Sequence, residues 1–150
     1  MKILFVCTAN IVRSFMAERI LMERLKKENK TDIEVSSGAI IDMDGAPPDP
    51  KAVKILLEHG LNGAGHISSL VTEDMITDAD MILVMENIHR EIICNQYPVS
   101  REKTYLLKSF SRDYNTAFAD IKDPHQLSTH HYRTCFAEIA TAIDRLLKCI

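Results

Sequence analysis

The chain has 150 residues, of which 46% are apolar and 26% charged, and its formal net charge at pH 7 is −3. This composition is ordinary for a soluble globular protein, and the charge gives no reason to expect binding to nucleic acid or to an anionic membrane. The sequence opens with no signal segment and contains no apolar run of about 18 residues. We therefore expect a single domain over residues 1–150, located in the cytoplasm.

The chain contains four cysteines, at Cys7, Cys94, Cys135 and Cys149. They form no C-x-x-C pair and lack the spacing of a zinc site, so free thiols in a reducing compartment are the simplest interpretation. The neighbours His130 and His131 fall on an expected helix, where adjacent residues point apart, and they do not indicate a metal. We expect no metal and no other cofactor.

Hydrophobic patterns predict an alternation of strands and helices. Short apolar runs indicate strands at 3–6, 32–36, 81–85 and 104–107. Apolar residues at helical spacing indicate helices at 14–27, 50–59, 72–77, 88–95 and from 128 to the end. Residues 38–50 and 111–127 are expected to be loops. The alternation predicts an α/β fold in three layers, with a parallel sheet flanked by helices.

Particular residues indicate where elements begin and end. Three residues are expected to cap the first turn of a helix: Asp49, Thr72 and Ser128. Pro50 follows Asp49 at a first helical position, where proline is well tolerated. Ser37-Gly38 is expected to end the second strand.

The segment that joins the first strand to the first helix is Cys7-Thr8-Ala9-Asn10-Ile11-Val12-Arg13-Ser14. A loop that enters a helix presents backbone N–H groups without intrahelical partners, and the helix dipole adds positive charge, so the loop can bind an oxyanion. The same field stabilises a thiolate, which makes Cys7 a candidate nucleophile. Arg13 offers a planar fork for two phosphate oxygens, Ser14 can donate its hydroxyl to the sulfur, and Asn10 tolerates a left-handed backbone.

The alternative interpretation is that Cys7 is an inert buried cysteine at a strand end. A Cys-x5-Arg pattern by itself arises easily by chance. Its position at a strand-to-helix junction, with Asn10 inside it and Ser14 next to it, favours the chemical interpretation.

A second group is needed if a cysteine is to displace an alcohol or a phenol from phosphorus. A phenol has a pKa near ~10, so a proton donor lowers the barrier to its departure. The segment Asp120-Ile121-Lys122-Asp123-Pro124-His125 lies in the loop before the last helix. Asp123 is the candidate general acid, and Asp120 is the competing one.

These motifs resemble, in order and over nearly the whole chain, the low-molecular-weight protein tyrosine phosphatases. The matching segments are VCTANIVRS at 6–14, SSG at 36–38, G-x-P-x-D-P at 45–50, H-x-S at 66–68, TDADMILVM at 77–85 and the DP at Asp123. The resemblance implies a four-stranded parallel sheet with a phosphate loop after the first strand. It also implies a phosphatase that works through a phosphocysteine intermediate without a metal.

The resemblance assigns roles to individual residues. Cys7 is the implied nucleophile, Arg13 the implied phosphate-binding arginine and Asp123 the implied general acid. Asn10 and Ser14 support the loop, with His66 as the buttress of Asn10. The implied phosphate-binding set is Thr8, Ala9, Asn10, Ile11, Val12, Arg13 and Ser14.

Three positions in and after the loop depart from the family pattern. Ala9 stands where glycine is usual, which would cost stability or affinity if that residue needs a positive φ or a close approach to phosphate. Val12 replaces a second cysteine that can trap the oxidised nucleophile as a disulfide, so Cys7 is expected to be more prone to irreversible oxidation. Phe15 replaces a proline.

The expected pocket wall also departs from the family. It consists of Ile11, Met43 and His125, the last at a position where tyrosine or phenylalanine is common. The middle of the chain is similar to the bacterial branch that includes protein arginine phosphatases, which carry a threonine where this chain has Ile11. An apolar side chain there suits an aryl ring, so phosphotyrosine is the preferred substrate and phosphoarginine the alternative.

Two further alternatives stay open. A phosphate-binding pseudophosphatase would result if Ala9 and the altered wall prevent turnover. An arsenate reductase is disfavoured because Cys94 has no further cysteine near it for a relay. The expected partners are a phosphorylated protein as substrate and inorganic phosphate as product and inhibitor.

Overall fold

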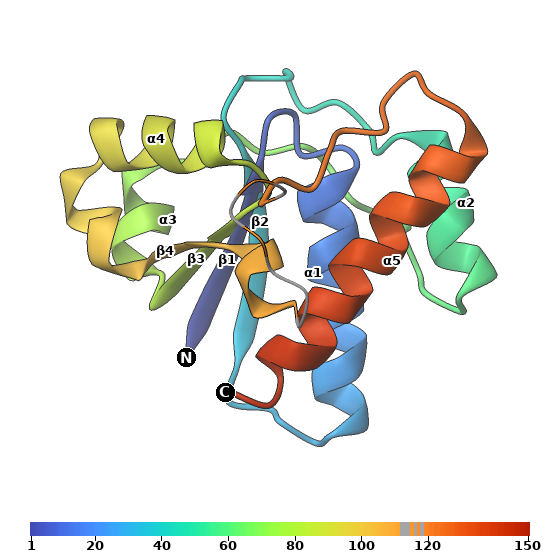
Figure 1. The fold of residues 1–150 in the computed structure, drawn as a ribbon, viewed down its shortest axis with the longest axis horizontal. Coiled ribbons are helices and arrows are strands. Elements are labelled where there is room, and N and C mark those ends of the chain that lie inside the picture. Colours follow the sequence, from blue (N-terminus) through green and yellow to red (C-terminus); the bar gives the residue numbers. More distant parts are fainter. Residues whose placement is uncertain (112–114, 116, 118) are drawn as a thin grey trace.

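A four-stranded parallel sheet forms the centre of the protein (Figure 1). The structure is a computed structural model, and it describes the whole chain except residues 112–114, 116 and 118. The strands are β1 (Lys2–Cys7), β2 (Glu34–Ala39), β3 (Met81–Val84) and β4 (Thr104–Leu106), in the spatial order β2-β1-β3-β4. The chain runs from β1 outward to β2, then returns to add β3 on the opposite side of β1. Parallel sheets commonly bind ligands at the carboxyl ends of strands where the order reverses in this way.

Helices cover both faces of the sheet (Figure 1). One face packs against α1 (Arg13–Lys27), α2 (Pro50–Glu58) and α5 (Thr129–Leu146), and the other against α3 (Glu73–Asp78) and α4 (Asn87–Gln96). Strand β1 explains the two cores, because its alternate side chains point to opposite faces. Ile3 and Phe5 belong to the first core, whereas Leu4 and Val6 belong to the second. The three-layer α/β fold expected from the sequence is confirmed.

Two of the three expected helix caps are confirmed. The Asp49 carboxylate accepts a hydrogen bond from the Lys51 amide at 2.8 Å, and α2 starts at Pro50. The Thr72 hydroxyl accepts one from the Met75 amide at 3.3 Å. Ser128 stands at the N-cap position of α5 as expected, but its hydroxyl lies 2.8 Å from a ring nitrogen of His131 and makes no cap hydrogen bond.

The expected end of the second strand is also wrong. Strand β2 continues through Gly38 to Ala39, which pair with Val6 and Cys7 of β1. Glycine is needed there for a close approach, because a Cβ on Gly38 would lie 2.7 Å from the side chain of Val71. A serine–glycine pair is typical of turns, and the sequence does not reveal that another segment packs against this strand.

Other ends differ by a few residues. Strand β4 is shorter than expected and is flanked by two 3-10 helices, η1 (Pro98–Lys103) and η2 (Leu107–Phe110), that the pattern did not predict. The last helix ends at Leu146 rather than at the end of the chain. Part of the loop expected at 111–127 lies outside the described residues, and the single domain over 1–150 stays a prediction.

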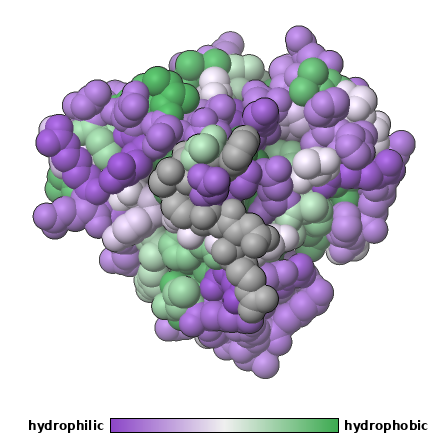
Figure 2. Space-filling model, in the orientation of Figure 1, coloured by the Kyte–Doolittle hydropathy of each residue, from purple (hydrophilic) through white to green (hydrophobic). Residues whose placement is uncertain are grey.

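The face seen in Figure 2 is mostly hydrophilic, with apolar residues in small separate groups. No helix in the described part of the chain is both long enough and apolar enough to cross a membrane.

Candidate active site

The loop between β1 and α1, residues 7–14, is called the phosphate loop below. Cys7 is the last residue of β1 and is 3% exposed, and α1 begins six residues later at Arg13. The N-cap residue Val12 makes no side-chain cap hydrogen bond, and the first turn of α1 contains no acidic residue. These features leave the first-turn amides of α1 available to an external anion.

Two hydrogen-bond donors face the sulfur of Cys7. The Asn10 amide lies 3.3 Å from Sγ, and the Ser14 hydroxyl lies 3.0 Å from it. The side-chain amide of Asn10 donates to Ser14 Oγ at 2.8 Å, so that oxygen acts as an acceptor there and its own hydrogen is available to the sulfur. The donation from Ser14 expected from the sequence fits this geometry.

Asn10 is the hub of the loop. It is fully buried and adopts the left-handed conformation expected for it, with φ at 55°. Its side chain also donates to Ser37 Oγ at 2.9 Å and accepts from the Ser69 amide at 3.1 Å. Its carbonyl accepts from Nε2 of His66 at 2.7 Å, which places His66 in the expected buttress position.

The departures at positions 9 and 15 have structural explanations. Ala9 is absent from the residues with positive φ, so alanine carries no backbone penalty there, and its carbonyl accepts a hydrogen bond from Ser68 at 2.8 Å. Phe15 stacks on the ring of His66, with 4.2 Å between the ring centroids. A phenylalanine at this position therefore supports the same buttress of the loop.

Arg13 is 1% exposed and is held by one edge of its guanidinium group. Its Nη1 donates to Glu86 at 2.7 Å and to the carbonyl of Ile121 at 2.9 Å. Its Nη2 lies 3.6 Å from the carboxylate of Asp123. Burial alone would lower the pKa of Arg13, but the negative charges of Cys7, Glu86 and Asp123 raise it. The guanidinium group is therefore charged over the whole working range of pH.

The other edge of this guanidinium group, formed by Nε and Nη2, is incompletely bonded among the described residues. Among the described residues, Nε of Arg13 is buried and has no hydrogen-bond partner. The contact of Nη2 with Thr8 Oγ1 is long, at 3.5 Å. A buried donor without an acceptor is costly, and an oxyanion in the phosphate loop would satisfy both nitrogens at once.

Two residues around Arg13 and Thr8 were not predicted from the sequence. Glu86 orients Arg13, and His89 lies with its Nε2 2.9 Å from Thr8 Oγ1. A signal for Glu86 exists, because it follows the apolar strand β3 and the carboxyl ends of neighbouring parallel strands meet at one edge. His89 has no comparable signal, since a lone histidine in a helix is usually a packing residue.

The segment of residues 120–127, called the acid loop below, carries both candidate acids. Asp123 is 45% exposed in its side chain and lies beside Arg13. Asp120 instead accepts a hydrogen bond at 2.7 Å from the amide of Asn87, the first residue of α4. The geometry favours Asp123 as the acid, because it lies beside Arg13 while Asp120 is engaged in a hydrogen bond at the start of α4.

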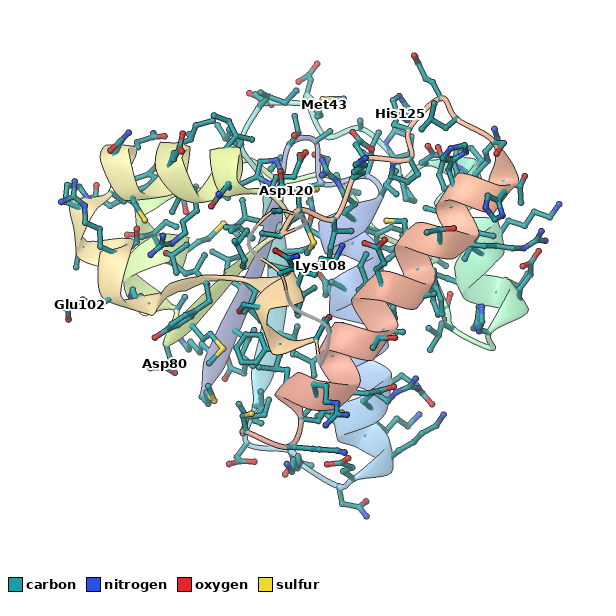
Figure 3. The ribbon with its side chains drawn as sticks, viewed as in Figure 1. Met43, Asp80, Glu102, Lys108, Asp120 and His125 are labelled. Atoms are coloured by element: carbon teal, nitrogen blue, oxygen red, sulfur yellow. The ribbon has the colours of Figure 1, made fainter. Side chains whose placement is uncertain are left out.

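The three expected wall residues lie on separate loops. Ile11 is half-buried in the phosphate loop and packs on the core, while Met43 and His125 lie at the same end of the molecule (Figure 3). The ring of His125 is hydrogen-bonded to Asp49, with its Nδ1 3.0 Å from a carboxylate oxygen. Tyr132 donates to the same oxygen at 2.5 Å. His125 therefore has a structural partner that the sequence did not predict.

A cavity of about 840 Å³ adjoins the acid loop rather than the phosphate loop. Asp120, Asp123 and Lys108 line it together with residues of α5, whereas Cys7 and Arg13 do not. We place the chemistry at Cys7, because the donors converge there. Among the described residues, no three histidine, cysteine or acidic side chains gather as ligands for a metal.

A buried thiol between two donors, beside a guanidinium group with a free edge, defines a cysteine site for a tetrahedral oxyanion. A family model described as low molecular weight phosphotyrosine protein phosphatase matches residues 2–150. The chain is 35% identical over 147 residues to a protein-arginine-phosphatase of Geobacillus stearothermophilus, covering 97% of this chain and 93% of that one. It is 31% identical over 143 residues to the low molecular weight protein-tyrosine-phosphatase Wzb of Escherichia coli K12, covering 95% of this chain and 88% of that one.

Solved structures agree with the sequence matches. The low molecular weight protein tyrosine phosphatase of T. tengcongensis superposes with a TM-score of 0.91 at 30% identity, covering 100% of this chain and 99% of that one. The chain belongs to the low molecular weight phosphotyrosine protein phosphatase family. The resemblance drawn from the sequence is thereby confirmed, and the relatives include enzymes of both the tyrosine and the arginine branches.

Proposed function

We propose that the protein hydrolyses phosphotyrosine in phosphorylated proteins through a phosphocysteine intermediate. The observation that carries the proposal is the convergence at Cys7. Two donors contact its sulfur. Beside it, Arg13 keeps Nε without a partner among the described residues. Such an arrangement stabilises both a thiolate and the equatorial oxygens of a phosphoryl group.

The first chemical step transfers the phosphoryl group to sulfur. The Cys7 thiolate attacks phosphorus in line with the leaving oxygen, so that the S–P bond forms as the P–O bond breaks. Arg13 and the loop amides of residues 8–14 bind the equatorial oxygens throughout. Asp123, protonated, gives its proton to the leaving phenol oxygen, and the phenol departs neutral.

The second step releases the phosphoryl group. Asp123, now a carboxylate, accepts a proton from a water molecule that attacks phosphorus, and the S–P bond breaks. Ser14 stabilises the returning thiolate through its hydroxyl. Inorganic phosphate leaves as the product, and it inhibits at high concentration because it occupies the same loop.

Ile11 is the residue on which the choice of substrate rests. It presents no hydrogen-bond acceptor or donor side chain, so it suits an aryl ring better than a guanidinium group. The second candidate is phosphoarginine hydrolysis, which the name of the Geobacillus stearothermophilus relative supports. The free cysteines fit a reducing compartment, and the cytoplasmic location stays a prediction.

The test is steady-state hydrolysis of p-nitrophenyl phosphate, a phosphotyrosine peptide and phosphoarginine, with Cys7→Ser and Asp123→Asn as variants. We expect the phosphotyrosine peptide to exceed phosphoarginine in kcat/KM and Cys7→Ser to abolish turnover. Asp123→Asn should lower kcat by about 10²- to 10⁴-fold. Its effect on kcat/KM should be larger on the phosphotyrosine peptide than on p-nitrophenyl phosphate, because the less acidic phenol depends more on the donated proton.

Asp120→Asn is the matched control for the acid. It removes one carboxylate from the same loop, and we expect it to lower stability more than kcat, since Asp120 accepts from the first amide of α4. A higher kcat/KM on phosphoarginine than on the phosphotyrosine peptide would assign the protein to the arginine branch. A wild-type protein that binds phosphate or vanadate but turns over none of the three substrates would instead be a phosphate-binding pseudophosphatase.

A further inference from the structure

His89 contacts the phosphate loop from α4. It is 1% exposed, and its Nε2 lies 2.9 Å from the hydroxyl oxygen of Thr8, the residue that follows Cys7. Nothing in the chemical steps above uses either side chain. Which ring nitrogen of His89 carries the proton decides whether His89 donates to Thr8 or accepts from it.

The hydrogen bonds of His89 fix its tautomer. The backbone N–H of Glu86 donates to Nδ1 at 3.1 Å, so Nδ1 carries a lone pair and the ring proton is on Nε2. A second proton on Nδ1 would face that N–H. Burial, together with the charge of Arg13, lowers the pKa of His89 to about 4, so the ring is neutral at neutral pH. Two oxygens face Nε2: Thr8 Oγ1 at 2.9 Å and the Glu86 carboxylate at 3.4 Å. The Nε2–H donates to the nearer one, Thr8 Oγ1.

The hydroxyl proton of Thr8 is then left without an acceptor among the described residues. Its oxygen receives the donor from His89 at 2.9 Å and faces a second donor, Nη2 of Arg13, at 3.5 Å. Within the part of the chain that the structure describes, no carboxylate or carbonyl accepts from this hydroxyl. Glu86 is the nearby carboxylate, and it is bound to Arg13 at 2.7 Å. The proton is free to point toward an anion beside Arg13.

We propose that Thr8 donates its hydroxyl proton to the phosphoryl oxygen bound by Arg13, and that His89 is the positioning residue that holds Thr8 in this donor state. The inference rests on the proposed function for the identity of the anion. It adds a side-chain donor to a cradle otherwise made of backbone amides and a guanidinium group. It also explains why a neutral histidine is buried next to the most positive part of the site.

Two variants of His89 separate positioning from a structural role. His89→Asn places an acceptor where Nδ1 lies, so it can retain the bond from the Glu86 amide, but it is too short to reach Thr8. His89→Gln reaches Thr8 with an N–H donor but loses the bond from Glu86. If His89 serves only to cap α4, the asparagine variant should resemble wild type. If it positions Thr8, the glutamine variant should bind the anion better.

The readout is the affinity for orthovanadate and inorganic phosphate, measured directly by isothermal titration calorimetry on the full chain. We expect Thr8→Val to weaken binding about 10- to 100-fold and Thr8→Ser to restore most of it, because the hydroxyl bonds a charged oxygen. His89→Asn should weaken binding about 5- to 10-fold, and His89→Gln less than about 3-fold. In the Thr8→Val background, His89→Asn should have little further effect. Thermal unfolding of each variant shows whether it is folded.

The proposal is overturned by any of three results with folded variants. These are unchanged binding in Thr8→Val, better binding by His89→Asn than by His89→Gln, or an equal effect of His89→Asn with and without Thr8. Because binding is measured without turnover, a protein that hydrolyses no phosphomonoester can still support the roles of Thr8 and His89. The proposed function would then fail on the substrate panel alone.

Discussion

The phosphate loop and the acid loop are held in different ways. In the phosphate loop Asn10 and Ser14 are fully buried, and Arg13 is 1% exposed. In the acid loop the side chains of Asp123 and His125 are each 45% exposed. The first loop is part of the core, whereas the second crosses the surface between α5 and the end of the sheet (Figure 1).

This difference matches the role proposed for each loop. An oxyanion is stabilised best by donors that are already in place, because no reorganisation is then needed during the reaction. A general acid that gives a proton in one step and takes one from water in the next must change charge and contact solvent. The exposure of Asp123 suits the role proposed for it, and its contact with Arg13 is long, at 3.6 Å. The phosphate loop is therefore the part in which single substitutions should be most damaging.

Asn10→Ala should break the phosphate loop with the largest effect on stability. It removes the side-chain bonds to Ser14, Ser37 and Ser69 and leaves their buried groups unsatisfied. We expect the free energy of unfolding in urea to fall by roughly 2 to 4 kcal/mol. Asn10→Gly should be nearly as unstable, because it relieves the positive φ but restores no bond.

Asn29→Ala is the matched control. Asn29 has the same φ of 55°, yet it is exposed at the end of α1, and its side chain makes no hydrogen bond within the described chain. We expect a loss of only about 1 kcal/mol, and Asn29→Gly should recover it. Equal losses at both positions would mean that backbone conformation, rather than the bonds of Asn10, stabilises the phosphate loop.

The pH dependence of stability should also be dominated by the buried side of the site. The pKa of His89 is about 4 in the folded protein and ~6.5 in an unfolded chain, so the unfolded state binds the proton more readily between these values. The stability contributed by the neutral ring is complete above about pH 6.5 and is lost as the pH falls toward 4. We expect the loss to be on the order of 2 to 3 kcal/mol.

His89→Gln provides the reference for this measurement, because glutamine does not titrate. The difference in the free energy of unfolding between wild type and His89→Gln should shrink as the pH falls from 7 toward 4. Carboxylates titrate in both proteins, so their contribution to the free energy of unfolding cancels from the difference. A difference that stays constant over this range would show that His89 keeps its ordinary pKa when folded.

The phosphate loop was predictable because its signal is local. Cys7 ends an apolar run, Arg13 starts a helical pattern, and both features lie within a few residues of each other. The N-cap at Asp49 was predictable for the same reason. A left-handed backbone at Asn10 could also be predicted, because few residue types other than glycine and asparagine tolerate that conformation.

The unpredicted contacts are those that the fold brings together from distant segments. Glu86 meets Arg13, and His89 meets Thr8, only because β3 lies beside β1 in the sheet. The continuation of β2 through Gly38 also depends on a neighbouring segment. Local propensity cannot predict such contacts, because it does not tell which strands pair or in which register.

Substitution of His125 in the acid loop should have the smallest effect of those considered. Its ring nitrogen lies 3.0 Å from the carboxylate of Asp49, and the Asp49 amide donates to the carbonyl of Ile11 at 3.0 Å, so Asp49 connects the two loops. Bonds from Tyr132 and His125 lower the pKa of Asp49, although burial alone would raise it. His125→Ala removes only the exposed side of this connection. We expect stability to change by less than about 1 kcal/mol and kcat on p-nitrophenyl phosphate to fall about 2- to 5-fold.

His125→Phe distinguishes a connection between the loops from a pocket wall. Phenylalanine keeps a ring beside the site but cannot bond to Asp49. If the connection matters, kcat falls as in His125→Ala. If the wall matters, KM for aryl phosphates should be restored or improved while kcat stays at the wild-type value. The second result would assign His125 to the substrate, as the sequence suggested. The acid loop would then be held by its other bonds, among them those from Arg13 to the carbonyl of Ile121 at 2.9 Å and from Lys51 to the carbonyl of Leu127 at 3.0 Å.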